Sequence, residues 1–331
     1  MKISVALCTY NGEKFIREQL MTILSQTKLP DEIIISDDNS KDSTLQIVEE
    51  LAETANVKFV IHKNVPGLGV FKNFEKAISL CTGDVIFCCD QDDTWHLDKI
   101  EKFMPHFERS DVTLVYSNAA VVLNNASHYL YPLWTKKDMM NEISGTASYP
   151  TLFYRGGSIA GCCMAFRREF VHSIMPFPEK VYHDDWIATC AVLKGTIATV
   201  HEELMDYRQH GNNVVGIVRG GKLSYYKSLL TNVRPYIEHR EYIYDRHRKI
   251  SAGFDTHQIL SDCQKKEWEE NLDFTSHRAM VRKQSALISF KQMLSDFCKG
   301  YYSKYGKGIY EFFLDVYDLI VIILFMKETA E

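Results

Sequence analysis

The sequence predicts an α/β fold, in which helices cover both faces of a mostly parallel sheet, followed by a helical C-terminal region. Short apolar runs alternate with helical patterns over roughly the first 120 residues, as in a parallel sheet buried on both faces. Polar clusters follow three of these runs. After about Arg219 the pattern is helical to the end. We therefore expect two parts, residues 1–218 and residues 219–331.

The strands of the first part are predicted from short, continuous apolar runs. The first four are Ile3–Leu7, Glu32–Ser36, Val57–Ile61 and Val85–Cys89. The intervening helices show apolar residues on one face, as with Ile16, Leu20 and Ile23. Further along, strands are expected at Thr113–Leu123 and Ser158–Phe166, and a helix at Asp185–Leu193. Pro235 is expected to break the later helical pattern.

The composition is that of an ordinary globular protein, with 46% hydrophobic and 24% charged residues among 331. The nine cysteines include no CxxC pair and lie mostly in apolar runs, so we expect buried free thiols in a reducing cytoplasm. The N-terminus lacks the pattern of a signal peptide. A cytoplasmic protein without a nucleic-acid partner is expected.

The charge is unevenly distributed. The whole chain carries a net charge of −5, whereas Arg219–Lys307 has 17 basic and 10 acidic residues, or 17 − 10 = +7, which leaves −12 for the remainder. The apolar run Leu319–Met326 is only eight residues long, and Asp315 and Asp318 precede it, whereas a spanning helix needs ~20 residues. No transmembrane helix is therefore expected. The C-terminal helix either packs on protein, including a second copy, or lies in a lipid interface, which the basic stretch favours.

Three polar clusters fall where ligands bind, beyond the carboxyl ends of parallel strands. They are Thr9-Tyr10-Asn11, Asp37-Asp38-Asn39-Ser40 and Asp90-Gln91-Asp92-Asp93. Carboxylates at such a position suit Mg²⁺ or Mn²⁺, which bridge protein oxygens to a diphosphate and neutralise a departing nucleotide. The alternative for the third cluster is an acidic turn that caps the next helix.

Two further carboxylate positions have a chemical interpretation beside a structural one. Asp38 can accept the imide N–H of uracil or thymine, while Ser40 or Asp42 caps the next helix. Asp184 and Asp185 stand at a predicted helix start, where a carboxylate stays ionised and can act as a general base, or serves only as an N-cap.

The segment Tyr207–Asn213 holds a further pair of candidates. His210 could ligate a metal or donate a hydrogen bond to a phosphate, and Arg208 could pair with a phosphate. A lone surface histidine, however, more often has no functional role. The aromatic residues of 129–154 could stack on an acceptor sugar or pack as a loop.

With these clusters in order, residues 1–215 resemble family-2 glycosyltransferases of the GT-A fold. Cys8–Gly12 and Ile35–Asp42 resemble the two nucleotide-binding turns of that family, Lys72-Asn73 its Arg-Asn pair, and Asp90–Trp95 its metal-binding DxD. The Asp90–Trp95 form resembles the rhamnosyltransferase-type branch. The elements that share this resemblance are Gly161–Phe166, His183–Trp186 and Tyr207–Asn213.

The resemblance implies an inverting, metal-dependent transferase. Its donor would be a dTDP- or UDP-linked sugar, with dTDP-L-rhamnose first and a UDP-hexose as the alternative. Its acceptor would be a glycan or lipid-linked saccharide at the inner face of the membrane, and a homo-oligomer is compatible with it. The implied nucleotide-sugar contacts are Thr9, Tyr10, Asn11, Asp38, Lys72 and Asp90. Asp92, Asp90 and His210 would hold Mn²⁺ or Mg²⁺.

The general base is assigned by position within the resemblance. Most of the family has Glu-Asp there, whereas this chain has His183-Asp184-Asp185. Counting back from Trp186 makes Asp184 the base and Asp185 the reserve. A sugar-nucleotide pyrophosphorylase is disfavoured, because no Gly-rich loop follows the first strand. A non-catalytic carbohydrate-binding relative is disfavoured by the intact aspartate clusters.

Overall fold

The structure is a computed structural model that describes residues 1–123, 128–134, 142–144, 159–210, 234–281, 283–306 and 308–325. The described residues fall into two compact units, here called the N-terminal unit (up to residue 210) and the C-terminal unit (from residue 234). The predicted boundary at residue 218 lies outside the described residues.

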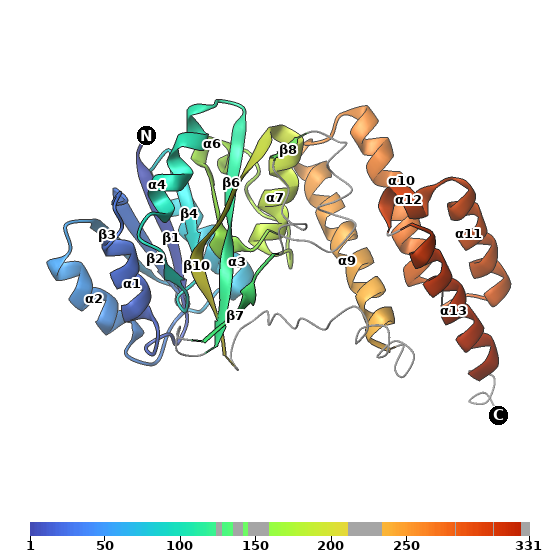
Figure 1. Cartoon of the computed structure of the whole chain (residues 1–331), viewed down its shortest axis with the longest axis horizontal. Coiled ribbons are helices and arrows are strands. Elements are labelled where there is room, and N and C mark those ends of the chain that lie inside the picture. Colours follow the sequence, from blue (N-terminus) through green and yellow to red (C-terminus); the bar gives the residue numbers. More distant parts are fainter. Residues whose placement is uncertain are drawn as a thin grey trace. The chain divides into compact units, whose positions relative to one another are not determined.

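The N-terminal unit is built on one mixed sheet (Figure 1). Its main path has the order β3-β2-β1-β4-β9-β6-β10-β5, with β7 beside β6 and β8 beside β10. The strands are β1 (Ile3–Thr9), β2 (Glu32–Asp37), β3 (Lys58–Lys63), β4 (Val85–Cys89), β5 (Thr94–Trp95), β6 (Val112–Leu123), β7 (His128–Pro132), β8 (Glu142–Ser144), β9 (Met164–Arg167) and β10 (Thr196–Gln209). Strands β3, β2, β1 and β4 are mutually parallel, as predicted, while β9 runs antiparallel to both β4 and β6.

The helices of this unit follow the strands. They are α1 (Ile16–Leu24), α2 (Thr44–Thr54), α3 (Val70–Leu80), α4 (Lys99–Phe103), α6 (Arg168–His172) and α7 (His183–Lys194), with 3₁₀ turns η1 (Met104–Glu108) and η2 (Gly161–Cys163). Val5 and Leu7 of β1 join the core formed with Leu20 of α1 and Val48 of α2. Since alternate residues of a strand face opposite sides, α3, which contacts β1 and β2, covers the other face, where Phe74 is buried.

The structure adds detail to three sequence expectations. Of the strand expected at Ser158–Phe166, the described part begins at Ile159, and in it only Met164 onward is strand, because residues Gly161–Cys163 form a 3₁₀ turn. The break expected at Pro235 falls at the start of α9, where Pro235 stands in the first turn and no intrahelical donor is lost, while residues 211–233 lie outside the described residues. Seven cysteines are buried and all nine are free, but Cys263 and Cys298 are exposed.

The C-terminal unit is helical throughout its described residues. Its helices are α9 (Arg234–His257), α10 (Asp262–Ala279), α11 (Ala286–Cys298), α12 (Tyr301–Tyr305) and α13 (Ile309–Phe325). Ser261 and Gln264 form a capping box that fixes the start of α10. Among the helices of the described residues, none is both long and apolar enough to cross a membrane.

Candidate active site

The first polar turn is fixed by hydrogen bonds between the ends of β1 and β2. Thr9 pairs in register with Asp37, and its Oγ1 donates to Asp37 Oδ2 over 2.8 Å. Asp37 Oδ1 also accepts from the amide of Ser40 at 2.9 Å. Thr9 is 1% exposed, so its hydroxyl shapes this turn and does not face solvent.

Gln91 joins the β1 turn to the cluster after β4. Its Nε2 donates to the carbonyl of Tyr10 at 3.0 Å, and its Oε1 accepts from the Tyr10 amide at 2.9 Å. A Cβ on Gly12 would lie 2.1 Å from Gln91 Oε1, so a larger residue at this position would displace the Gln91 side chain from its bonds to Tyr10. The backbone of Tyr10 is therefore fixed while its side chain is exposed, as is that of Asn11, whose Oδ1 accepts from the Lys41 amide at 2.9 Å.

Asp38 organises the loop that precedes α3. Its two carboxylate oxygens accept from the amides of Leu68 and Gly69, at 2.5 and 2.9 Å. Gly69 has a φ of +78°, and a Cβ on Gly67 would lie 3.0 Å from the Asp38 carbonyl oxygen, so both glycines allow the close approach. Since a carboxylate offers about four lone-pair sites, Asp38 retains acceptor capacity for a ligand.

Lys72 directly follows this loop, in the first turn of α3. Its Nζ pairs with Glu75 at 2.5 Å and donates to the carbonyl oxygen of Phe177 at 3.3 Å. The side chain is 41% exposed, so its ammonium group remains open to an anion beside the loop that Asp38 holds.

Two carboxylates and a thiol converge below the end of β4. One ligand atom from each of Asp90, Asp93 and Cys162 lies within 4.8 Å of the others. Asp93 is 2% exposed, and its Oδ1 accepts from the Arg208 amide at 3.1 Å. Its Oδ2 is buried without a hydrogen-bond partner among the described residues. Burial, followed by the charges of Asp92 and Asp90, raises the pKa of Asp93 well above its usual range.

Asp92 contacts His210, which directly follows the C-terminal end of β10. His210 Nε2 lies 2.8 Å from Asp92 Oδ2, and the imidazole stacks on Phe15 with ring centroids 4.7 Å apart. The register of the antiparallel pair β5–β10, which sets Thr94 opposite Asp206, carries the preceding and following residues toward each other. The structure thus brings together two of the three residues predicted to hold a metal.

Asp90, the third residue predicted to hold a metal, is affected by the negative charges of neighbouring carboxylates. Burial raises its pKa to about 7, and the charges of Asp92 and Asp184 add to the effect. The positive charge of the fully buried Lys99 acts in the opposite direction and lowers the pKa of Asp90. The Lys99 Nζ donates to the carbonyl oxygen of Cys162 at 2.7 Å. Burial lowers the pKa of Lys99. Residues from β4, α4 and α7 therefore act on one site.

The first turn of α7 supplies the candidate base. Asp184 is half-buried, and its Oδ1 accepts from the Asp185 amide at 2.8 Å. Asp185 is only 6% exposed. His183 is buried against Phe74, with ring centroids 3.8 Å apart, and burial lowers its pKa to about 3. Of the two predicted carboxylates, Asp184 is thus the more accessible.

The donor set fits a hard divalent cation. Asp90, Asp92 and Asp93 offer carboxylate oxygens, the donors that Mg²⁺ and Mn²⁺ prefer, and His210 offers an imidazole nitrogen. The buried, unpartnered oxygen of Asp93 and the mutual repulsion within the cluster are what a bound cation would relieve. The soft thiol of Cys162 is the least suited member of the group.

The sequence analysis missed several residues of this site, and some residues that it named lie outside the described residues. Lys99 and Cys162 gave no signal, because a single lysine in a helix or a cysteine in an apolar run is commonplace. Asp93 lies in the cluster that was singled out, but its contact with Arg208 depends on how β10 pairs. Gly211–Asn213 and most of the aromatic stretch 129–154 lie outside the described residues.

The sequence matches the family model described as "Glycosyl transferase family 2" over residues 4–175. The chain therefore belongs to this family, and it is a glycosyltransferase by family. It is 31% identical over 224 residues to "dTDP-rhamnosyl transferase RfbG" of Shigella flexneri. This alignment covers 63% of this chain and 73% of the Shigella protein. Other curated relatives matched over more than 200 residues are covered over 60% to 68% of their own length.

Solved structures show the same architecture. TarS of Staphylococcus aureus (residues 1–349), solved in complex with UDP-GlcNAc, has a TM-score of 0.60 and 18% identity, covering 85% of this chain and 73% of that one. The mannosyltransferase PcManGT of Pyrobaculum calidifontis, in complex with GDP-Man and Mn²⁺, has a TM-score of 0.51 and 16% identity, covering 100% and 88%. The fold is GT-A, as predicted, followed by C-terminal helices.

Proposed function

We propose that this glycosyltransferase is an inverting, metal-dependent enzyme that transfers L-rhamnose from dTDP-rhamnose to a lipid-linked or growing cell-surface polysaccharide. The observation that carries the proposal is the contact of His210 with Asp92 beside Asp90 and Asp93, in a cluster whose Asp90 carboxyl also interacts electrostatically with Asp184. A single displacement needs a cationic group for the leaving diphosphate and a base for the acceptor, and these residues can provide both.

Asp92, Asp90 and His210 would hold Mn²⁺ or Mg²⁺. When bound, the cation neutralises the charge that develops on the leaving nucleoside diphosphate. Asp93 keeps His210 within reach of Asp92, because its hydrogen bond to the Arg208 amide fixes the end of β10 two residues before His210. Lys99 limits the repulsion among the carboxylates from below.

Asp184 would take the proton of the acceptor hydroxyl as that oxygen attacks the anomeric carbon. Its position in the first turn of α7 favours the ionised carboxylate through the helix dipole. Asp185 would instead position this turn, because its side chain is buried. Buried His183 would pack under the turn as a neutral ring.

The nucleoside would lie over the ends of β1 and β2. Asp38 would accept the imide N–H of thymine or uracil, and the exposed ring of Tyr10 offers a surface on which the base can stack. Asn11 and Lys72 would contact the ribose or diphosphate. Thr9, whose hydroxyl is buried on Asp37, would contribute through its backbone and the shape of the turn.

The choice of donor is supported by the similarity to the dTDP-rhamnosyl transferase, since the nucleotide turns fall within the aligned family domain. A UDP-hexose donor is the alternative, supported by the likeness of fold to the UDP-GlcNAc complex. Both share the imide N–H that Asp38 would recognise. A lipid-linked acceptor would present its sugar at the cytoplasmic face of the membrane, where we place the enzyme as a peripheral protein.

Thermal-shift measurements with Mn²⁺ test this proposal against dTDP-rhamnose, UDP-glucose, UDP-galactose and UDP-N-acetylglucosamine. A bound nucleotide sugar raises the unfolding temperature by mass action. The proposal expects the largest shift with dTDP-rhamnose. A larger shift with a UDP-sugar would select the alternative donor, and no shift with any of the four would contradict a nucleotide-sugar enzyme of this specificity.

A further inference from the structure

Two packed helices of the C-terminal unit expose their apolar side chains and bury their acidic ones. On α13, Ile309, Phe313, Tyr317 and Ile320 are 58%, 60%, 37% and 47% exposed. Their spacing of four, four and three residues places them on one face of the helix. Phe312, on another side, packs on Phe297 of α11 with ring centroids 4.5 Å apart.

The acidic residues of α13 point inward. Asp315 and Asp318 are fully buried, and both pair with Arg240 of α9. Asp315 also pairs with Arg278 of α10 at 2.7 Å and accepts from the Tyr302 hydroxyl at 2.9 Å. The aspartates that interrupt the apolar sequence therefore anchor the helix to its own unit and leave its outer face without charge.

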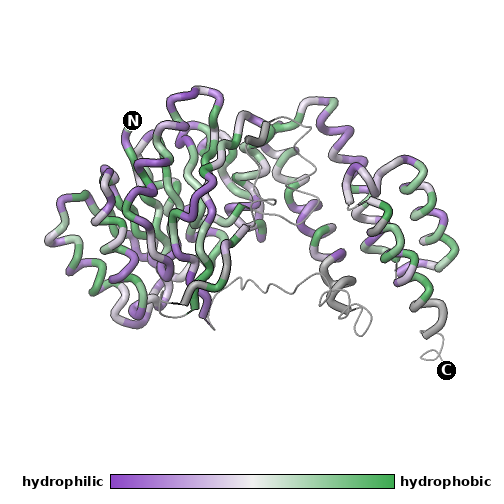
Figure 2. Tube along the Cα trace, in the orientation of Figure 1, coloured by the Kyte–Doolittle hydropathy of each residue, from purple (hydrophilic) through white to green (hydrophobic). Residues whose placement is uncertain are grey.

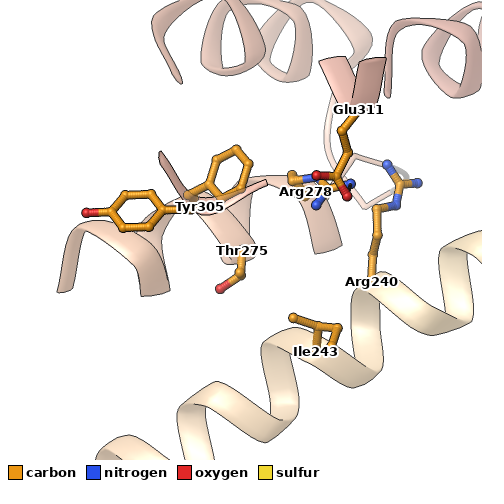
Figure 3. Close-up of a pocket in the computed structure, with 7 residues that line it drawn as sticks. Arg240, Ile243, Thr275, Arg278, Tyr305 and Glu311 are labelled. Carbon is orange, nitrogen blue, oxygen red and sulfur yellow. Dashed lines mark ion pairs between the residues drawn. The ribbon is translucent and has the colours of Figure 1, made fainter. Parts of the chain in front are cut away.

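The neighbouring pocket belongs to the same polar interior. Arg240 and Arg278 extend from α9 and α10 toward one space, where Glu311 of α13 pairs with Arg278 at 3.0 Å (Figure 3). Buried ion pairs of this kind fix a helix in one rotation, because turning it would leave the partner charges unpaired.

Helix α11 repeats the arrangement. Leu287 is 65% exposed, Ile288 is 49% exposed, and Phe290, Leu294 and Phe297 are each 40% exposed. Its one carboxylate, Asp296, is buried and lies 2.9 Å from His277 Nδ1. Figure 2 shows the hydrophobic stretches along both helices. Exposed apolar residues that cluster in this way mark an interaction surface.

The exposed charges of α11 and of its C-terminal flank are basic. Lys291 and Lys299 are exposed, whereas Asp296, the carboxylate of α11, is buried. Lys283 and Lys304 are already paired, with Glu241 and with Glu267 and Glu270. An apolar helix face bordered by lysines complements an anionic lipid surface.

We propose that the exposed faces of α11 and α13 dock this protein on an anionic membrane surface. The apolar side chains would enter the boundary of the acyl chains, and Lys291 and Lys299 would lie among the lipid phosphates. The inference goes beyond the transfer reaction and does not depend on which sugar is transferred. In this proposal, the buried ion pairs of Asp315 and Asp318 fix the rotation of α13 and so keep its apolar face exposed.

Flotation of the full chain with vesicles tests the proposal and separates binding from aggregation. With phosphatidylglycerol–phosphatidylcholine vesicles at low salt the protein should float, and with phosphatidylcholine alone it should not. The double variant Leu287→Glu/Phe313→Glu should lose about 10-fold or more of the bound fraction relative to free protein, because both apolar anchors are removed. Met21→Glu, at a 50% exposed helix position of the N-terminal unit, is the matched control and should bind normally.

Charge reversal gives the second arm. Lys291→Glu/Lys299→Glu should weaken binding and reduce its salt dependence, since lipid phosphates would lose two partners. Thermal unfolding of every variant should match that of the wild type, because the altered side chains are exposed. Wild-type protein that stays with the unbound fraction would overturn the proposal. So would a wild-type dimer by light scattering that Leu287→Glu/Phe313→Glu converts to monomers, because the face would then join two copies.

Discussion

His210 Nε2 and Asp92 Oδ2 lie 2.8 Å apart although 118 residues separate them in the sequence. The contact arises because β5, directly after the aspartate cluster, pairs antiparallel with β10, whose end leads to His210. Each of the two residues alone has an ordinary structural interpretation. Together with Asp90 and Asp93 they form a polar cluster that a divalent cation would stabilise.

Removing the charge of Asp92 should remove most of the activity. Asp92→Asn keeps the shape of the side chain, and sugar transfer should fall at least ~100-fold, in line with the loss of one key electrostatic contact. The control is Asp98→Asn, at a carboxylate five residues past the cluster, which pairs with Lys102 on the surface; this variant should keep wild-type activity. Full activity of Asp92→Asn in EDTA would refute the metal site.

The base is tested by comparing the neighbouring aspartates. Asp184→Asn should abolish transfer and leave nucleotide affinity nearly unchanged, because the base acts on the acceptor and not on the donor diphosphate. Steady-state transfer and calorimetric nucleotide binding measure the two effects. Asp185→Asn should mainly lower the unfolding temperature, since that side chain is buried. An inactive Asp185→Asn beside an active Asp184→Asn would reverse the assignment.

The nucleobase should be selected by its imide N–H. UDP and CDP differ little in shape, but the cytosine ring lacks the proton that Asp38 would accept. We expect UDP and dTDP to bind at least ~10-fold more tightly than CDP, which is the effect of one buried hydrogen bond to a charged group. Calorimetry with the three nucleotides and GDP measures this difference. Tighter binding of GDP than of both UDP and dTDP would contradict the role of Asp38.

The buried His183 should make stability depend on pH. Its pKa in the native protein is about 3, below the value of ~6.5 in an unfolded chain, so between these values only the unfolded chain takes up the proton. Stability is therefore lost as pH falls from 6.5 toward 3, by at most ~1.4 kcal/mol per pH unit from this group. His183→Phe should flatten the fall in unfolding temperature over that range.

The control for this prediction is His201→Phe, at an exposed histidine of β10. That variant should lose stability with falling pH as steeply as the wild type does. If His183→Phe and the wild type have parallel pH profiles, His183 is not kept neutral by burial.

The parallel sheet and the site edge could be predicted because they depend on local pattern. Apolar runs identified β1, β2, β3 and β4, and their polar ends located Asp38 and Asp92. The extra contacts of the site could not be predicted, since Arg208 meets Asp93 only through the pairing of β10 with β5. A sequence pattern specifies which residues are buried in an element, but not the register between distant strands.

The same limit applies to the C-terminal helix. In the sequence, Asp315 and Asp318 interrupt an apolar run and argue against a helix that spans a membrane. In the structure they are buried against Arg240, 75 residues before Asp315, and the apolar residues face outward. The partner of a buried charge lies too far along the chain for periodicity to identify it.

The most direct test of the account is the release of nucleoside diphosphate from dTDP-rhamnose, measured with Mn²⁺ and with EDTA for the wild type and Asp92→Asn. We expect release by the wild type with Mn²⁺, loss of release in EDTA and recovery when Mn²⁺ is restored, with Asp92→Asn at least ~100-fold slower throughout. Equal release with Mn²⁺ and EDTA, or an Asp92→Asn variant as fast as the wild type, would contradict a metal-assisted transferase centred on Asp92.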